Sequence, residues 1–137
     1  GKLRMLRYLI CALLLAAGAY AQAPCKCGAT VASDSGDIVL YELPPVEIES
    51  CDAADICSLA CYESFDAISG GGDLNFITSD GVTTVGQYLC NLAATVIDSQ
   101  FAYANYDLCD SGWILTGDQT MQPLCCDDQG TYFECAK

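Results

Sequence analysis

The cysteines of this chain constrain its fold more than any other residue type does. Eleven of the 137 residues are cysteine, and all of them except Cys11 lie after residue 22. These ten cysteines can form five disulfides and leave no free thiol. The sequence therefore predicts a cysteine-rich, disulfide-bonded protein from an oxidising compartment. The cysteines concerned are Cys25, Cys27, Cys51, Cys57, Cys61, Cys90, Cys109, Cys125, Cys126 and Cys135.

The N-terminal segment has the parts of a secretory signal peptide. Lys2, Arg4 and Arg7 form a basic region. Residues 8–19 form an apolar run, and residues 19–21 (Ala-Tyr-Ala) form a cleavage site. A membrane anchor is the competing interpretation, but the run is shorter than the roughly 20 residues that a span needs. We therefore expect a secreted, extracellular protein.

The expected cleavage divides the chain after residue 21. Residues 1–21 would be an N-terminal extension and signal peptide, with translation starting at Met5. Residues 22–137 would then form a single disulfide-stabilised domain, a length that is ordinary for one domain. A cut two residues later would place Pro24 directly after it and is less favoured.

The chain after residue 22 is strongly acidic. It carries all eighteen Asp and Glu residues against Lys26 and Lys137 alone, which gives it a formal charge of −16. Nucleic acids and anionic membranes bind cationic faces, so neither is expected as a partner. A basic extracellular protein or matrix component is the partner that this charge favours.

One helix is predicted in the first half of the chain. Ser50 or Asp52 can cap it, and it should run to about Ile68, where the glycines of residues 70–72 end it.

A second helix is predicted from apolar residues that recur at helical spacing after Thr83 and Thr84, either of which can cap it. This helix should run to about Phe101.

Together with the predicted strands, the two helices favour a small α+β domain in which two helices are packed on a short antiparallel sheet. Those strands are residues 37–43, 74–78 and 113–116, with a hairpin over 124–135 that turns at 127–130.

Two cysteine pairs have a spacing that places each pair on one face of its element. Cys57 and Cys61 lie one helical turn apart, and Cys25 and Cys27 lie two apart in an extended segment. The two pairs can be laid against each other and bridged twice. We therefore predict a double disulfide between these segments.

This arrangement resembles the cysteine-stabilised α/β motif of defensins and scorpion toxins, in which a C-x-x-x-C helix is tied to a C-x-C strand. The likeness covers residues 25–27 and 57–61. In this chain the C-x-C comes before the helix, the chain is far longer, and the charge is opposite to that of a membrane-active defensin. The resemblance therefore implies a shared disulfide geometry, and we carry no function over from it.

Cys125 and Cys126 are adjacent, so on a strand they point to opposite faces and can be tied to two different elements. The alternative is a zinc site in which these two thiolates join Cys57 and Cys61. The oxidising compartment disfavours that alternative.

Catalysis has few candidate residues. The chain has no histidine, which excludes Ser-His and Cys-His nucleophile pairs and histidine-ligated zinc. Paired carboxylates, as in glycoside hydrolysis, remain, but no local pattern singles out two of them. We therefore expect a protein without catalytic residues or a cofactor.

Calcium is the one metal that the acidic loops favour. Asp107 with Asp110 and Asp127 with Asp128 are close pairs beside Gly112 and Gly130. None of these pairs has the spacing of an EF-hand loop, so only weak binding is expected.

Three aromatic residues are candidates for a binding face, namely Phe101, Tyr103 and Tyr106. The alternative, which we favour, is that they close the core where the second helix ends. Trp113 is likewise expected to be buried in the core.

Three classes of function remain. The first is a non-catalytic structural component of a secretion or extracellular material, or a binding module. The second is a toxin-like or inhibitor-like ligand of a protein target, with residues 69–73 or 103–112 as its exposed loop. The third is a carboxylate-dependent hydrolase.

Overall fold

A computed structural model describes residues 23–136 of the protein. The predicted signal peptide and its cleavage site lie outside these residues. The described part contains two helices and antiparallel sheets, which confirms the small α+β domain. In chain order the elements are β1 (Ala23–Ser33), β2 (Gly36–Glu42), β3 (Val46–Ile48), α2 (Ala54–Ser69), α3 (Val85–Ala93), β4 (Ile97–Gln100), β5 (Tyr103–Leu108), β6 (Ile114–Gln119) and β7 (Leu124–Cys126).

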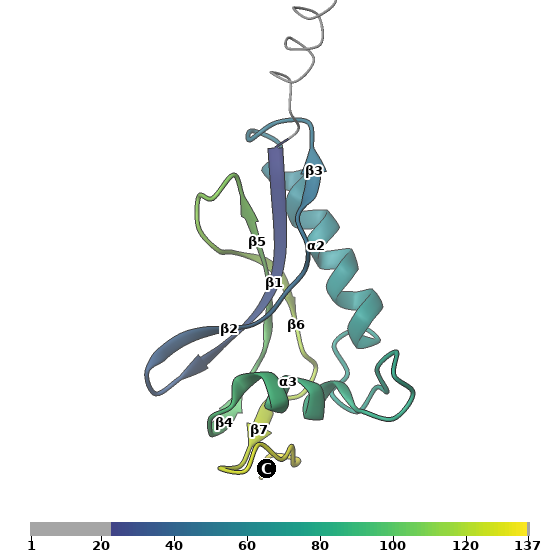
Figure 1. Cartoon of the computed structure of the whole chain (residues 1–137), viewed down its shortest axis with the longest axis vertical. Coiled ribbons are helices and arrows are strands. Elements are labelled where there is room, and N and C mark those ends of the chain that lie inside the picture. Colours follow the sequence, from purple (N-terminus) through teal and green to yellow (C-terminus); the bar gives the residue numbers. More distant parts are fainter. Residues whose placement is uncertain (1–22, 137) are drawn as a thin grey trace, which may run out of the picture.

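The long strand β1 is the centre of the main sheet (Figure 1). One edge of β1 pairs with β5, and the other edge pairs first with β2 and then with β3. Pro44 and Pro45 separate β2 from β3, as expected of residues that cannot continue a ladder of hydrogen bonds. β6 pairs with β5 and completes five strands.

The prediction of a short sheet was wrong. Besides the five-stranded sheet, β4 and β7 form a second, two-stranded antiparallel sheet. The 11-residue strand β1 and the strand β5 were not among the predicted strands, and they pair over residues 25–30 of β1.

The helix α2 covers one face of the main sheet (Figure 1). Cys57, Cys61 and Phe65 recur every four residues and are buried toward β1 and β5. The predicted end at Gly70 is confirmed, because this residue adopts the left-handed conformation and donates its N–H to Asp66 O. The predicted caps were wrong, since the helix begins after Ala53 without a side-chain cap.

The helix α3 begins as predicted and ends early. Thr84 caps it by accepting a hydrogen bond from Gln87 N at 3.1 Å. The helix stops at Ala93, where the next residue turns left-handed, and residues 97–100 form β4 instead of the expected last two turns. Ile97 fits the helical spacing, yet it is buried in this strand opposite Cys126. Long-range pairing has overridden a local pattern.

Of two smaller predictions, one was wrong and the other is confirmed in part. Residues 74–78 form turns with a single bridge, Ile77 to Thr84, and no strand. The predicted hairpin over 124–135 is reduced to β7, a turn, and one bridge from Cys126 to Tyr132.

All ten cysteines of the described residues form disulfides. The predicted double link is confirmed as Cys25–Cys57 and Cys27–Cys61, which tie β1 to α2. Cys126 bonds Cys90 of α3 and Cys125 bonds Cys135, so these adjacent cysteines are tied to two different segments, as predicted. The fifth disulfide is Cys51–Cys109.

These pairings separate the four cysteines of the zinc alternative. Cys57 and Cys61 belong to the cluster between β1 and α2, and Cys126 belongs to the cluster around α3. Among residues 23–136, neither helix has the length and apolar character needed to cross a membrane.

Candidate functional site

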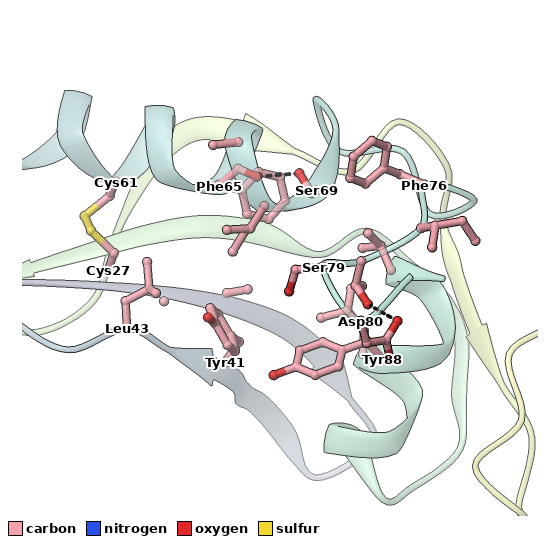
Figure 2. Close-up of a pocket in the computed structure, with 18 residues that line it drawn as sticks. Cys27, Tyr41, Leu43, Cys61, Phe65, Ser69, Phe76, Ser79, Asp80 and Tyr88 are labelled. Carbon is pink, nitrogen blue, oxygen red and sulfur yellow. Dashed lines mark hydrogen bonds between the residues drawn. A yellow bond between two sulfur atoms is a disulfide. The ribbon is translucent and has the colours of Figure 1, made fainter. Parts of the chain in front are cut away.

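A pocket of about 490 Å³ opens between α2, the first two strands and the segment that leads into α3 (Figure 2). The Cys27–Cys61 disulfide lies at one end of this pocket, and residues 76–80 line the other end. The sheet supplies the floor through residues 27–29 of β1 and through Tyr41 of β2.

The walls of the pocket are mostly apolar. Phe65 and Ile68 of α2 line it, and so do Val85 and Leu89 of α3. Ligand pockets in proteins are built in this way, with apolar walls and a small number of polar groups that fix orientation. The other apolar and aromatic lining residues are Leu43, Ala67, Phe76, Ile77 and Tyr88.

Two tyrosines from different elements meet in the pocket. The rings of Tyr41 on β2 and Tyr88 on α3 lie edge to face, with centroids 5.9 Å apart (Figure 2). Burial, and to a smaller extent the neighbouring Tyr88, raises the pKa of Tyr41 above its ordinary value. Tyr41 is therefore a neutral phenol at physiological pH.

Asp80 is the one carboxylate in the lining of the pocket, among the residues that the structure describes. Its Oδ1 accepts hydrogen bonds from Val82 N at 2.8 Å, from Thr83 N at 2.7 Å and from the Thr78 hydroxyl at 3.0 Å. Bonds from the side chain and backbone of Thr83, and then from Val82 N, hold the pKa of this carboxyl well below its usual range. Asp80 is therefore ionised and held in one place.

The segment that carries Asp80 is fixed to the rest of the fold. Val85 donates its N–H to Phe76 O and Gly86 donates its N–H to Leu74 O, both at 2.8 Å. Leu74 is fully buried in the core, and its own N–H bonds the Gln122 side chain. The pocket wall is thus anchored at its base by backbone bonds and by a buried leucine.

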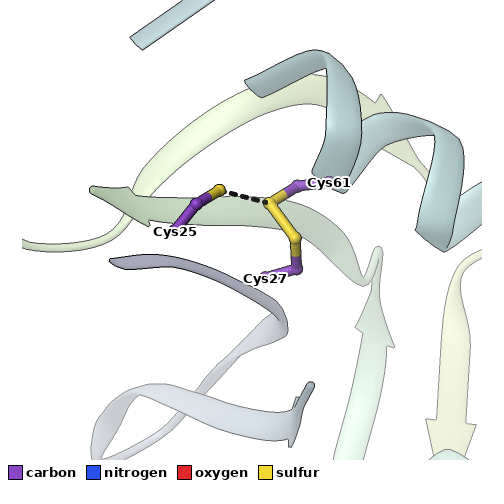
Figure 3. Close-up of side chains that lie close together, drawn as sticks. All are labelled: Cys25, Cys27 and Cys61. Atoms are coloured by element: carbon purple, nitrogen blue, oxygen red, sulfur yellow. Dashed lines mark hydrogen bonds between the residues drawn. A yellow bond between two sulfur atoms is a disulfide. The ribbon is translucent and has the colours of Figure 1, made fainter. Parts of the chain in front are cut away.

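Three sulfur atoms gather beside the pocket (Figure 3). The Sγ atoms of Cys25, Cys27 and Cys61 lie within 4.8 Å of one another, and Cys25 Sγ lies 3.9 Å from Cys61 Sγ. Within residues 23–136 this is the single group of three candidate metal-ligating residues so close together. Because all three are in disulfides, the group holds no thiolate that could bind a metal.

Three of the four aspartates predicted for calcium bond to groups of the protein itself. Asp110 forms an ion pair with Lys26 at 2.9 Å, and the nearly buried Asp107 accepts a hydrogen bond from Gly112 N at 3.3 Å. Asp127 accepts from the N–H groups of residues 129 and 131, while Asp128 is exposed in the same turn. Weak calcium binding by these residues stays a prediction.

The aromatic candidates do not form one face. Tyr103 and Tyr106 are half-buried on β5 and lie three residues apart, which puts them on opposite sides of the strand. Tyr106 is packed against the cluster between β1 and α2. Phe101 is half-buried before the strand, and the half-buried Trp113 covers Gly28 on the main sheet. None of these four residues lines the pocket.

The two segments predicted as exposed loops are also structured. In residues 69–73, Ser69 and Gly72 are buried, and Gly72 N bonds the Ser69 hydroxyl. Residues 103–112 consist of β5 and the turn that follows it.

Sequence reasoning missed the residues that make the pocket. Tyr41 and Tyr88 look like ordinary positions of an amphipathic strand and helix, and Asp80 looks like a turn residue. A Thr-x-Asp turn just before a capped helix is a local signal, but nothing in it identifies a pocket.

Comparisons of the chain with protein-family models, with curated proteins and with solved structures found no match.

Proposed function

We propose that this protein is a secreted, non-catalytic binding protein whose pocket between α2 and α3 takes a small ligand with an apolar body. The observation that carries the proposal is the pocket of about 490 Å³. Its size falls within the roughly 300–1,000 Å³ that is typical of ligand sites.

The chemistry of the lining supports binding over catalysis. Asp80 is the single carboxylate among the described lining residues, whereas the two-carboxylate hydrolases need a pair on either side of the bond that is cut. The hydroxyls of Tyr41, Tyr88 and Ser79 can orient a ligand through hydrogen bonds.

The scaffold supports an extracellular place of action. Five disulfides in a domain of this size are typical of secreted proteins. The pocket is stiffened by one of them, because Cys27 and Cys61 line it directly. A stiff site loses less conformational entropy when a ligand binds.

The test is binding of a neutral apolar dye, N-phenyl-1-naphthylamine, followed by its fluorescence. We expect saturable binding by the wild-type protein. Ala67 lines the pocket on α2 and is exposed, so Ala67→Trp should fill the opening and abolish binding without disturbing the core.

The matched control is Leu59→Trp, which places the same bulk at an exposed position of α2 outside the pocket. This variant should bind the dye like the wild type. Absence of dye binding by the wild type, or equal binding by Ala67→Trp and Leu59→Trp, would overturn the proposal.

A further inference from the structure

The charges and rings of the pocket point to the class of its ligand: we propose that the pocket binds a small organic cation, an amine or quaternary ammonium carried on an apolar body. This inference rests on the proposed function, since it concerns the same pocket.

Among the residues that the structure describes, the lining of the pocket carries negative charge only. Asp80 carries a negative charge there, and none of the described lining residues is Lys or Arg. Lys26, the one basic residue between positions 23 and 136, lies outside the pocket and is paired with Asp110. An anionic ligand would give up its water and meet a like charge, whereas a cation would meet Asp80.

The charge of Asp80 is fixed in position. Three donors, from residues 78, 82 and 83, hold its Oδ1 in place, and they favour the ionised form. A ligand cation therefore finds an acceptor that needs no rearrangement and does not titrate at physiological pH.

The pocket also contains a set of aromatic rings. Tyr41, Tyr88, Phe65 and Phe76 all line the pocket and come from four different segments of the fold (Figure 2). The face of an aromatic ring attracts an ammonium group, and rings gathered around a cation are how proteins recognise quaternary ammonium ligands. The apolar walls can accommodate the rest of such a ligand.

A protein this acidic attracts any cation to some degree, so the test has to separate the pocket from the general field. Three compounds with one common body serve this purpose: 4-phenylbutylamine, 4-phenyl-1-butanol and 4-phenylbutyrate. Each competes with N-phenyl-1-naphthylamine for the pocket at physiological ionic strength, where interactions between distant exposed charges are largely screened.

In this competition we expect the amine to bind about five- to tenfold more tightly than the alcohol. The carboxylate should bind most weakly of the three. Asp80→Asn keeps an oxygen that can accept the hydrogen bonds of the turn. This variant should bind the amine with an affinity close to that for the alcohol. Tyr88→Leu removes a ring without touching the turn and should also reduce the preference.

The matched control is Asp37→Asn, which removes the same charge from an exposed position of β2 outside the pocket and should leave the preference unchanged. If alcohol and amine compete equally, or if Asp37→Asn reduces the preference as much as Asp80→Asn, the cation proposal is wrong while the apolar pocket stands. If the wild-type protein does not bind the dye at all, the pocket itself is wrong.

Discussion

The ring of Phe76 lies directly against Gly70, so that the residue that ends α2 and a residue of the pocket wall depend on each other. Gly70 has φ of 59°, and a β-carbon added to it would overlap the Phe76 ring. The end of the helix and the position of the wall are therefore set by the same glycine.

Gly70→Ala should destabilise the protein for two reasons. The left-handed backbone costs an alanine about 1–2 kcal/mol, and displacement of Phe76 adds to this. Gly81→Ala is the matched control, since Gly81 has φ of 76° and open space around its Cα. Urea unfolding should show a larger loss of unfolding free energy for Gly70→Ala than for Gly81→Ala, and dye binding should weaken in the former. Equal losses of unfolding free energy would show that the contact with Phe76 does not contribute to stability.

The pH dependence of stability should reflect Asp118 on β6. Its Oδ2 is buried without a hydrogen-bond partner, and burial, followed by the nearby carboxyl of Asp66 on α2, raises the pKa of Asp118 to about 6. In the unfolded chain this pKa is about 3.9. Because the folded state holds the proton more tightly, the contribution of Asp118 to stability is fully present below about pH 4 and is lost as the pH rises through 6.

Asp118→Asn should therefore raise the unfolding free energy at pH 8 by up to about 1 kcal/mol, a value limited by solvent screening. At pH 4 the same change should have little effect. Urea unfolding at both pH values measures the difference, and Asp37→Asn controls for the loss of one exposed charge. A gain of equal size at pH 4 and pH 8 would contradict this account.

The Cys51–Cys109 disulfide closes the longest loop of the five, with a sequence separation of 58. Cys51 is exposed and Cys109 is half-buried, so replacing both by alanine leaves little cavity. The unfolding free energy should fall by about 4 kcal/mol in the chain-entropy model, mainly because the unfolded chain gains conformational freedom. Thermal or urea unfolding measures it.

Neither of these cysteines lines the pocket, so the double variant Cys51→Ala/Cys109→Ala should still bind the dye while it is folded. A loss below about 1 kcal/mol would indicate that the unfolded chain is already compact around these residues.

The parts of the fold that local spacing determines could be predicted from the sequence. Cys57 and Cys61 share a helix face, Cys25 and Cys27 share a strand face, and the double link between the two pairs followed from those two periods. Thr84 and Gly70 act as helix boundaries through their own backbone neighbours, and both were recognised.

The parts that depend on distant partners could not be predicted in the same way. The strand β1 contains Lys26, Gly28 and several alanines, which carry a weak strand signal, and it is held by partners on both edges. The strand β4 has a helical pattern and is extended because it pairs with β7. Tyr41, Phe65 and Tyr88 line the pocket from three different elements, so no single stretch of the sequence predicts it.

Lys26 lies between Cys25 and Cys27, and each of these neighbours is bonded to α2. Between positions 23 and 136 this lysine is the one site at which trypsin could cut. A cut after Lys26 would leave its two new ends attached to Cys57 and Cys61, one helical turn apart. The strand would be severed and no piece would depart: without a reductant the cut protein would keep its mass apart from one added water, and only a reductant would reveal that the chain had been broken.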